Sequence, residues 1–329
     1  MEAIVLAGGF GTRLRPLTLT QPKPLLPLAN VPLLDRVIAS MPPEVDKVVV
    51  AVNYMADEIR RHFRDRPPGI ETEVVLEDRP LGTGGAIKNC QSHVEGTFVV
   101  RNADLYDTLD LTGMLAFHRK EDALATISLW PVDEPQHFGV VELDGTRIRR
   151  FVEKPPREEA PSNLINAGTY ILEPEVLDRI PGGKQVSIEA EIYPQVVSTP
   201  RGMRGYNVQG YWIDCGRPET YLEAHKQVLS GAQGGVVVGK DAVVEGRLQP
   251  WAAVGDRCTV ARGARVFEGV LLEGTTLEAG AHVLGSIVGR NCRIGAGAGV
   301  LSSVLGDNVT VKPGARIVGT TVDPGKQAG

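Results

Sequence analysis

The sequence contains only four cysteines, Cys90, Cys215, Cys258 and Cys292, and no two of them form a CxxC pair. It therefore predicts neither a disulfide framework nor a zinc site. No apolar run reaches the length of about 18 residues that a membrane-spanning helix needs. The N-terminus also lacks a basic region followed by a long apolar stretch, so no signal peptide is predicted. Together these absences predict a cytoplasmic protein that does not associate with a membrane.

The chain also lacks an excess of positive charge. Its 35 Lys and Arg residues are outnumbered by 40 Asp and Glu residues, and no Lys/Arg cluster stands out. Because binding to a nucleic-acid backbone needs a concentrated basic face, no nucleic-acid partner is predicted. Hydrophobic residues make up 42% and charged residues 23% of the chain, which is typical of globular proteins. A length of 329 residues predicts two domains.

In the first part of the chain, apolar runs typical of buried strands alternate with amphipathic helical patterns. Strands are predicted at residues 3–7, 47–52, 73–76, 98–101, 124–129, 140–143, 165–171 and 211–213, and helices at 33–40, 56–63, 85–91, 111–119 and 218–229. This alternation predicts an α/β, Rossmann-like, mostly parallel sheet with right-handed crossovers. Since such sheets bind ligands beyond the carboxyl ends of their strands, we expect the site in the loops that follow these runs.

From about residue 236 the pattern changes to a repeat. Five apolar residues recur every 17 residues, with further apolar residues between them in steps of six, six and five: Val254, Leu271, Val288, Leu305 and Val322. A hexapeptide repeat with three short sides per coil predicts a triangular parallel β-helix. The faces or edges of such a stack can pair with another copy, so self-association into a homo-oligomer through the β-helix is predicted.

A glycine-rich loop, GGFGTR at residues 8–13, follows the first predicted strand. Glycines allow backbone N–H groups to approach a phosphate closely. The loop is not a Walker A motif, and it is a poor dinucleotide fingerprint because Leu14 stands where the third glycine belongs. Tight packing without any ligand is therefore an equal alternative for the loop alone. The nearby cations Arg13, Arg15 and Lys23 favour a triphosphate, because they can neutralise its charge.

Further motifs follow this loop in a fixed order. They are LAGGFGTRLRPLT at 6–18, PKP at 22–24, PLGTGGA at 80–86, NAD at 102–104, FGVV at 138–141, VEKP at 152–155, INAGTY at 165–170, SIE at 187–189 and GYWID at 210–214. This set resembles the signature of the sugar-1-phosphate nucleotidylyltransferases, also called nucleotide-sugar pyrophosphorylases. The resemblance covers nearly all of the first 229 residues. It implies a catalytic nucleotidyltransferase domain at 1–230, followed by a left-handed β-helix at 231–329.

The resemblance implies a reaction in which a sugar 1-phosphate oxygen attacks the α-phosphorus of a nucleoside triphosphate and pyrophosphate leaves. The catalytic residues it implies are Arg13, Lys23, Asp104, Lys154 and Asp214. Asp104 and Asp214 both end strand-like runs, and a pair of carboxylates suits Mg²⁺, so these two are the expected metal ligands. A single Asp at a strand end is more often a turn or helix cap, and only its place in a matched motif favours the metal role.

The two substrates are assigned to different loops by the same resemblance. The nucleotide is expected at Leu6, Ala7, Gly8, Gly9, Gly11, Thr12, Arg13, Lys23, Glu77, Leu81, Gly82 and Thr83. The sugar phosphate is expected at Asp104, Gly139, Glu153, Lys154, Asn166 and Gly168. Asp107 and Asp110, near the first metal aspartate, are interpreted as helix caps.

The base is predicted from Glu77. Guanine presents two neighbouring donors that one carboxylate can accept, whereas thymine and uracil present one donor between acceptors and suit an amide. Glu77 therefore favours GTP, although it could instead point to solvent. Within the family, the motifs most resemble mannose-1-phosphate guanylyltransferases with a β-helix tail, which implies formation of GDP-mannose from mannose 1-phosphate. Arg101 and the segment LYD at 105–107 depart from the expected pattern.

Three alternatives remain at this point. The substrates could be dTTP and glucose 1-phosphate. The chain could be a non-catalytic homologue that binds a nucleotide sugar and regulates a partner, although the presence of the expected cations and aspartates argues against this. A second, acyltransferase activity could reside at His282, the single histidine of the repeat region.

Overall fold

The computed structural model describes residues 1–232 and 234–329, which fold into two compact units. The first unit comprises Met1–Gly9 and Leu34–Trp212, and the second comprises Phe10–Leu33 and Ile213–Gly329. A short N-terminal segment therefore belongs with the C-terminal part of the chain, which the sequence pattern did not indicate. Among the described residues, none of the helices combines the length and the apolar character that a membrane crossing demands.

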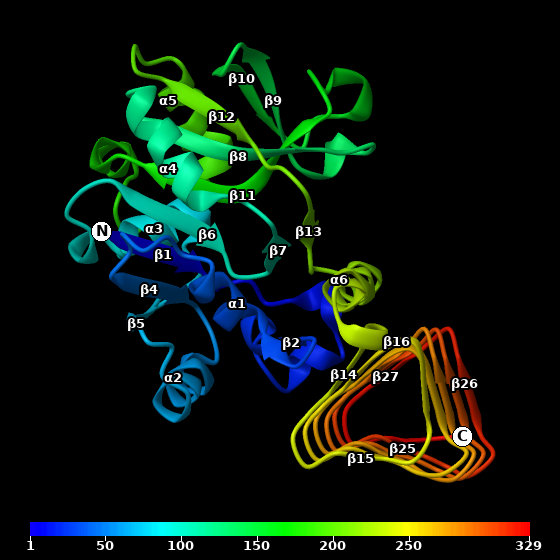
Figure 1. The fold of residues 1–329 in the computed structure, drawn as a ribbon. Helices are drawn as coiled ribbons and strands as arrows, with labels where there is room; N and C mark the ends of the chain where they lie inside the picture. Colours follow the sequence, from blue (N-terminus) through cyan, green and yellow to red (C-terminus); the bar gives the residue numbers. More distant parts are fainter. The chain divides into compact units, whose positions relative to one another are not determined.

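The first unit is built on a nine-stranded sheet of order β5-β4-β1-β6-β11-β8-β12-β10-β9 (Figure 1). The strands are β1 (Glu2–Leu6), β4 (Lys47–Val52), β5 (Glu71–Leu76), β6 (Phe98–Asn102), β8 (Ala125–Pro131), β9 (Gly139–Asp144), β10 (Arg147–Glu153), β11 (Leu164–Leu172) and β12 (Met203–Asn207). Strands β5, β4, β1 and β6 are mutually parallel, as predicted. The other half is mixed, because β11 is antiparallel to both of its main neighbours, β6 and β8.

Burial explains why the parallel strands could be recognised in the sequence. Ile4 and Val5 of β1 and Val49 and Val50 of β4 are completely buried, as residues covered on both faces of a sheet must be. The helices of this unit are α1 (Leu33–Ala39), α2 (Ala56–Asp65), α3 (Gly82–Asn89), α4 (Leu111–Lys120) and α5 (Tyr193–Val197). The side chain of Asp110 accepts a hydrogen bond from the Gly113 N–H at 2.8 Å, which confirms it as the N-cap of α4.

The tail of the chain is a parallel β-helix of triangular cross-section, as predicted (Figure 1). Its strands are β14 (Val236–Val238), β15 (Val243–Val244), β16 (Arg247–Val254), β17 (Thr259–Val260), β18 (Arg265–Leu271), β19 (Thr276–Leu277), β20 (His282–Leu284), β21 (Ile287–Val288), β22 (Arg293–Ile294), β23 (Gly299–Leu301), β24 (Val304–Leu305), β25 (Thr310–Val311), β26 (Arg316–Val318), β27 (Thr321–Val322) and β28 (Gln327–Ala328). Residues one repeat apart are direct partners in parallel pairs, as with Leu271, Val288 and Leu305. These side chains are completely buried and form the core of the coil stack.

The second unit also contains the N-terminal segment and α6 (Pro218–Ser230). The segment forms three short 3-10 helices and a hairpin: η1 (Thr12–Leu14), η2 (Leu17–Leu19), η3 (Lys23–Leu25), β2 (Pro27–Leu28) and β3 (Val31–Pro32). Helix α6 contacts β2, β16 and β18. The buried Tyr221 of α6 donates its hydroxyl hydrogen to the carbonyl of Pro27. The helix therefore packs between the segment and the β-helix.

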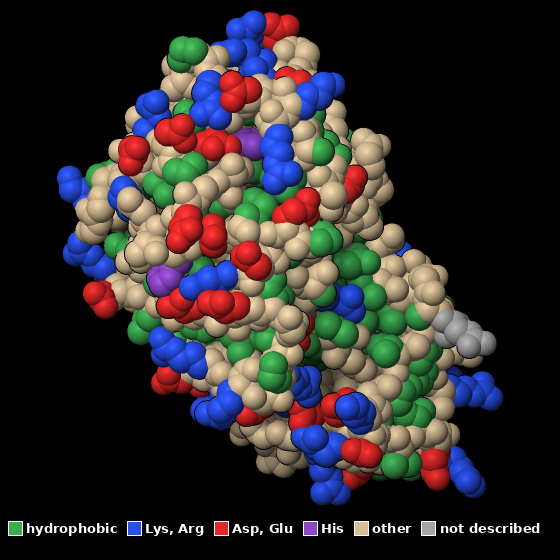
Figure 2. Space-filling model, turned by 60° about the vertical axis from the view of Figure 1, so that its left-hand side comes forward, with side chains coloured by type: hydrophobic (Ala, Val, Ile, Leu, Met, Phe, Trp, Pro, Cys, Tyr) green, Lys and Arg blue, Asp and Glu red, His purple; other side chains and the backbone are tan. Residues whose placement is uncertain are grey.

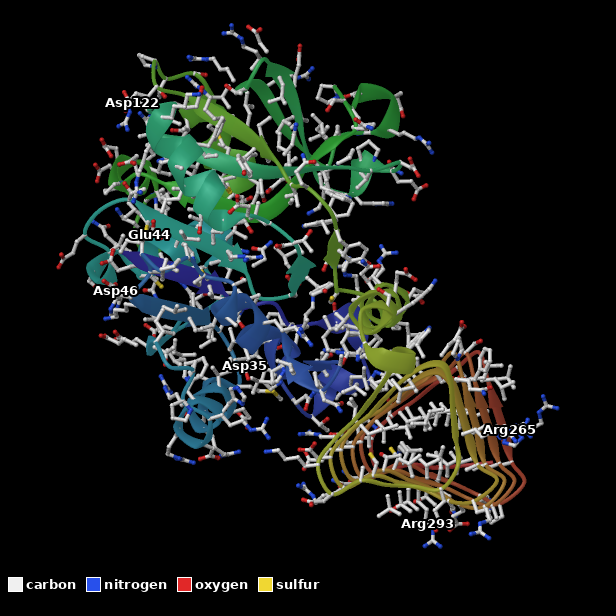
Figure 3. All side chains as sticks on the ribbon, in the orientation of Figure 1. Asp35, Glu44, Asp46, Asp122, Arg265 and Arg293 are labelled. Carbon is white, nitrogen blue, oxygen red and sulfur yellow. The ribbon has the colours of Figure 1, made fainter. Side chains whose placement is uncertain are left out.

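Two further short strands are β7 (Leu105–Asp107) and β13 (Trp212–Asp214). On the face shown in Figure 2, Lys and Arg side chains lie among Asp and Glu side chains rather than gathering in one basic area. In the β-helix, apolar side chains fill the interior, whereas Arg265 and Arg293 point outwards (Figure 3). The four cysteines are buried and free.

Candidate active site

A cavity of about 320 Å³ opens in the first unit where β1, β4, β5 and β6 end. The carboxyl ends of these parallel strands meet at one edge of the sheet, and their following residues line the cavity together with the start of α3. The lining residues are Leu6, Gly8, Gly9, Ala51, Asn53, Glu77, Pro80, Gly82, Thr83, Ala86, Asn102, Asp104 and Gln185. The cavity thus brings together Asp104 and several of the residues predicted to bind the nucleotide.

Glu77 follows β5 and points into this cavity rather than into solvent. It is 5% exposed, and its Oε2 accepts the N–H of Leu81 at 2.8 Å. Its Oε1 lies 3.4 Å from the position that a Cβ on Gly8 would occupy, so the carboxylate stands beside the glycine-rich loop. Burial raises the pKa of the Glu77 carboxyl, and the hydrogen bond from Leu81 opposes that rise. The alternative of a solvent-facing Glu77 is wrong.

Asn53 is a residue of this cavity that the sequence reasoning did not select. It directly follows β4, as Glu77 follows β5, and its amide lies close to Gly8. Its Oδ1 is buried and has no hydrogen-bond partner among the described residues. A buried amide oxygen in a cavity is suited to accept a hydrogen bond from a ligand. The signal that could have identified it is a polar residue placed immediately after a fully buried strand.

The beginning of α3 is fixed by a second polar network. The hydroxyl of Thr83 donates to Glu189 Oε2 at 2.5 Å and accepts the N–H of Ile188 at 3.0 Å. The hydroxyl of Ser187 donates to the same Glu189 oxygen at 2.9 Å. Gly82 has φ of 71°, and a Cβ there would collide with the backbone of Val186, so the turn into α3 requires glycine. Thr83, predicted to bind the nucleotide, therefore also holds α3 against the SIE motif.

Asp104 lies on the loop between β6 and β7 and lines the cavity. A buried ion pair flanks it in sequence: Arg101 donates from Nη2 to Asp107 Oδ2 at 2.5 Å and from Nη1 to Ser40 Oγ at 2.6 Å. Arg101 is 2% exposed, so its charge requires the Asp107 carboxylate beside it. The prediction of Asp107 as a helix cap is therefore wrong. Arg101 and Asp107, which both depart from the expected family pattern, are ion-pair partners of each other.

The loop expected to bind the sugar lies next to the Asp104 loop. Asn166 Oδ1 accepts the N–H of Gly168 at 3.0 Å, and its Nδ2 donates to the hydroxyl of Tyr170 at 2.9 Å. Gly168 has φ of 78°, and a Cβ there would lie 2.7 Å from Asn102 Nδ2. The close approach of the two loops therefore requires a glycine at this position.

Glu153 is the last residue of β10, where it pairs with Gly139 of β9, and Lys154 directly follows the strand. The ammonium of Lys154 lies 2.9 Å from Glu153 Oε1, and the Lys154 side chain is 64% exposed. A Cβ on Gly139 would lie 2.9 Å from Glu153 Oε2. Because exposed ion pairs contribute only about 0–1 kcal/mol, Lys154 can exchange Glu153 for a phosphate at little cost.

In the second unit, the structure brings together Arg13, Lys23 and Asp214. Arg13 Nη2 lies 3.6 Å from Asp214 Oδ2, and Lys23 Nζ lies 3.7 Å from Asp214 Oδ1. The Lys23 side chain is 7% exposed and that of Arg13 is 56% exposed. Gly11 has φ of 60°, and the Thr18 hydroxyl donates to its carbonyl at 2.8 Å, which closes the loop that contains Thr12 and Arg13. Two cations and one carboxylate are thus held at one place.

The two expected metal ligands lie in different units, Asp104 in the first and Asp214 in the second. Among the described residues, no three His, Cys, Asp or Glu side chains form a metal-holding group. Carboxylate oxygens are the donors that a hard divalent cation prefers. Asp104 lines a cavity and Asp214 is 27% exposed, so the donor chemistry of both fits such a cation.

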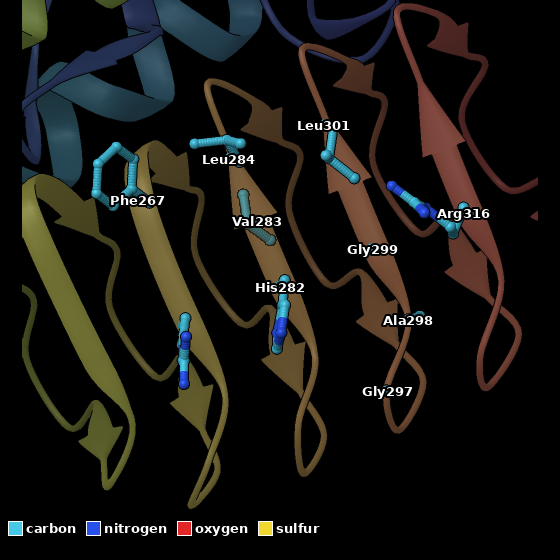
Figure 4. A pocket seen from close by; sticks show the side chains of 10 residues that line it. Phe267, His282, Val283, Leu284, Gly297, Ala298, Gly299, Leu301 and Arg316 are labelled. Carbon is cyan, nitrogen blue, oxygen red and sulfur yellow. The ribbon is translucent and has the colours of Figure 1, made fainter.

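His282 lies outside these sites, on the outer face of the β-helix. It lines a groove of about 630 Å³ together with Arg265, Arg316 and the apolar side chains of Phe267 and Leu284 (Figure 4). Strand pairing places Arg265 directly beside His282, and Phe267 beside Leu284. The groove is thus basic along one column of side chains and apolar along the next.

The two parts of the chain match two family models. Residues 2–231 match the model described as nucleotidyl transferase, and residues 232–328 match the GMPPB C-terminal domain. The chain therefore belongs to the nucleotidyl transferase family, as its motifs predict. It is 35% identical over 293 residues to the mannose-1-phosphate guanylyltransferase of Mycobacterium tuberculosis, a match that covers 86% of this chain and 81% of that protein.

Two further relatives agree with this result. The chain is 36% identical over 301 residues to the mannose-1-phosphate guanylyltransferase catalytic subunit beta of Danio rerio, covering 86% of this chain and 82% of that protein. The crystal structure of HddC from Yersinia pseudotuberculosis complexed with GMP-PN is similar with a TM-score of 0.59 and 30% identity. That match covers 69% of this chain and 99% of HddC.

Proposed function

We propose that the protein transfers the guanylyl group of GTP to mannose 1-phosphate, forming GDP-mannose and releasing pyrophosphate. The observation that carries the choice of base is Glu77, a buried carboxylate that faces a cavity beside the glycine-rich loop. A carboxylate has about four lone-pair sites, so Glu77 can accept the Leu81 N–H and still accept donors of a guanine. The names of the relatives support the same nucleotide and sugar.

The chemistry requires control of charge rather than a general base. The phosphate of a sugar 1-phosphate has a second pKa of about 6, so its dianion is already a nucleophile at neutral pH. Two anions must meet in line, and cations must stabilise the charge that spreads over the phosphate oxygens. Arg13 and Lys23 hold the triphosphate and the departing pyrophosphate, and Lys154 attracts the sugar phosphate. Removing one such contact costs roughly 2–4 kcal/mol of transition-state stabilisation.

Asp104 and Asp214 are the residues that would hold Mg²⁺. When bound, the ion supplies positive charge that offsets the negative charge of the phosphate oxygens. Asp214 is paired with Arg13 and Lys23 at distances of 3.6 and 3.7 Å, which are longer than hydrogen bonds. When a triphosphate binds, the exposed Arg13 side chain turns from Asp214 towards the phosphates, while the nearly buried Lys23 keeps its position. The Asp214 oxygen that Arg13 leaves could then hold the metal ion.

A panel of substrates tests this function. Pyrophosphate release is measured with GTP, dTTP, UTP and ATP, each combined with mannose 1-phosphate and with glucose 1-phosphate. We expect the highest kcat/KM for GTP with mannose 1-phosphate. The Glu77→Gln variant should lose about tenfold or more of its preference for GTP over dTTP, because an amide no longer accepts both guanine donors. Glu71→Gln, an exposed change on the same strand, is the control and should keep the preference.

Two results would contradict the proposal. The highest turnover with dTTP and glucose 1-phosphate would indicate a thymidylyltransferase and remove the role of Glu77. Binding of a nucleotide sugar without turnover of any substrate pair would indicate a regulatory homologue.

A further inference from the structure

The segment Phe10–Leu33 carries both cations of the proposed triphosphate site and belongs to the same compact unit as the β-helix. Within this segment, Thr20 lies between Arg13 and Lys23 in the sequence. The hydroxyl of Thr20 donates to Asp307 Oδ2 at 2.8 Å, and Arg290 Nη2 donates to the carbonyl of Thr20 at 3.2 Å. Two residues of the β-helix therefore hold both the side chain and the backbone of Thr20. We term Thr20, Arg290 and Asp307 the Thr20 anchor.

The β-helix half of the anchor is itself rigidly built. Arg290 and Asp307 are 17 residues apart, so they occupy equivalent corners of two successive coils. Asp307 is 4% exposed. Its Oδ1 accepts the backbone N–H of Arg290, and its Oδ2 accepts the Arg290 Nε, both at 2.7 Å. A buried carboxylate with this many charge-assisted bonds has one available geometry, which makes it a fixed point for Thr20.

A second contact holds the other end of the same segment. Asn30 Nδ2 donates to the carbonyl of Val254, in β16, at 2.8 Å. The segment is thus attached to the β-helix at Thr20 and at Asn30, and Lys23 lies between these two points. Because the Lys23 side chain is 7% exposed, its ammonium has little freedom of its own, and its position depends on the backbone that carries it.

We propose that the Thr20 anchor positions the phosphate-binding cations, so that Asp307 and Arg290 of the β-helix are positioning residues for nucleotidyl transfer. The inference rests on the proposed function, because it assumes that Arg13 and Lys23 bind the triphosphate. It assigns the tail a part in catalysis, although Arg290 and Asp307 are not among the residues proposed to bind the substrates. A misplacement of about 1 Å in a reacting geometry can lower the rate by up to about a hundredfold. Loss of the Thr20 anchor should therefore lower the rate of nucleotidyl transfer strongly, although Arg13 and Lys23 are both still present.

Two variants of the full chain test the inference. Thr20→Val keeps the size of the side chain but removes the hydroxyl, and Asp307→Asn removes the charge that binds Arg290. Arg293→Met is the matched control, because Arg293 forms an exposed ion pair with Glu278 on the same β-helix and points outwards (Figure 3). We expect kcat/KM for the nucleoside triphosphate to fall about tenfold or more in both anchor variants. The KM for the sugar phosphate should stay within about twofold, and the control should match the wild type.

Hydrogen exchange provides a readout that does not depend on activity. Amides of residues 12–25 should exchange faster in both anchor variants, while those of the β-helix coils keep their protection in Thr20→Val. Unchanged kinetics in Thr20→Val and Asp307→Asn, with or without faster exchange, would overturn the positioning role. A wild-type protein that is inactive with every substrate pair would instead contradict the proposed function, and the exchange rates would still decide whether the anchor holds the segment.

Discussion

At the residue scale, Glu77 connects the proposed base specificity with a pH dependence. Both of its oxygens accept hydrogen bonds without restriction only when it is ionised, since protonation turns one of them into a donor. Burial raises its pKa from the ordinary value of 4.5. The folded protein therefore holds this proton more tightly than the unfolded chain does. Consequently, the contribution of Glu77 to the free energy of unfolding falls as the pH rises from 4.5 through the raised pKa, and it is constant at higher pH.

Recognition of GTP should depend on the protonation of Glu77. As the pH is lowered from neutral towards the raised pKa of Glu77, the carboxylate becomes protonated and loses an acceptor. We therefore expect the KM for GTP to rise in the wild type, whereas in Glu77→Gln it should already be high and change little. Steady-state kinetics over this pH range measure the effect. A wild-type KM for GTP that follows the same pH profile as that of Glu77→Gln would remove Glu77 from base recognition.

Single residues were predicted from the sequence to different degrees. Arg13, Lys23 and Asp214 were selected from motifs, and the structure places them together. The inward direction of Glu77 could not be predicted, because it depends on the Leu81 N–H that it accepts. The pairing of Asp107 with Arg101 was missed, since an Asp after a strand resembles a cap unless the buried cation is known.

At the scale of elements, the β-helix was the most predictable part of the chain. From β18 onwards, successive coils repeat the same pairing, so the 17-residue period of Leu271, Val288 and Leu305 specifies the long-range contacts as well as the local ones. Strands β10 and β12 were not predicted, because their sequences, RIRRFVE and MRGYN, contain no continuous apolar run. Their place in the sheet comes from tertiary pairing with β9 and β8.

The repeat makes a prediction about stability. Leu305 is fully buried in the β-helix core, whereas Leu284, on the outer face, is 38% exposed. We expect Leu305→Ala to lower the free energy of unfolding of the β-helix by about 2–5 kcal/mol, because it leaves a cavity between coils. Leu284→Ala should cost much less. Urea unfolding of the full chain measures both, and equal losses in the two variants would contradict the packing described for the coils.

At the scale of the whole molecule, the two family models meet at residues 231 and 232, near the change of sequence pattern, but the two compact units are not continuous in the chain. The pattern changes near residue 230, but Phe10–Leu33 folds with the C-terminal part. Local periodicity cannot reveal that this segment folds with the C-terminal part. That assignment depends on contacts of Thr20 and Asn30 with residues more than 200 positions away in the sequence. The glycine-rich loop thereby belongs to both units, since Gly8 and Gly9 lie in the first and Gly11 in the second. Self-association through the β-helix stays a prediction.

The central proposal is that Arg13 and Lys23 bind the triphosphate, that Asp104 and Asp214 are the metal ligands, and that Glu77 recognises the base. A crystal structure of the protein with Mg²⁺ and a non-hydrolysable GTP analogue tests it most directly. We predict Arg13 and Lys23 on the phosphates, Asp104 and Asp214 on the metal ion, and Glu77 at the guanine edge. A triphosphate bound away from Arg13 and Lys23, or a metal ion that contacts only one of the two aspartates, would contradict the account.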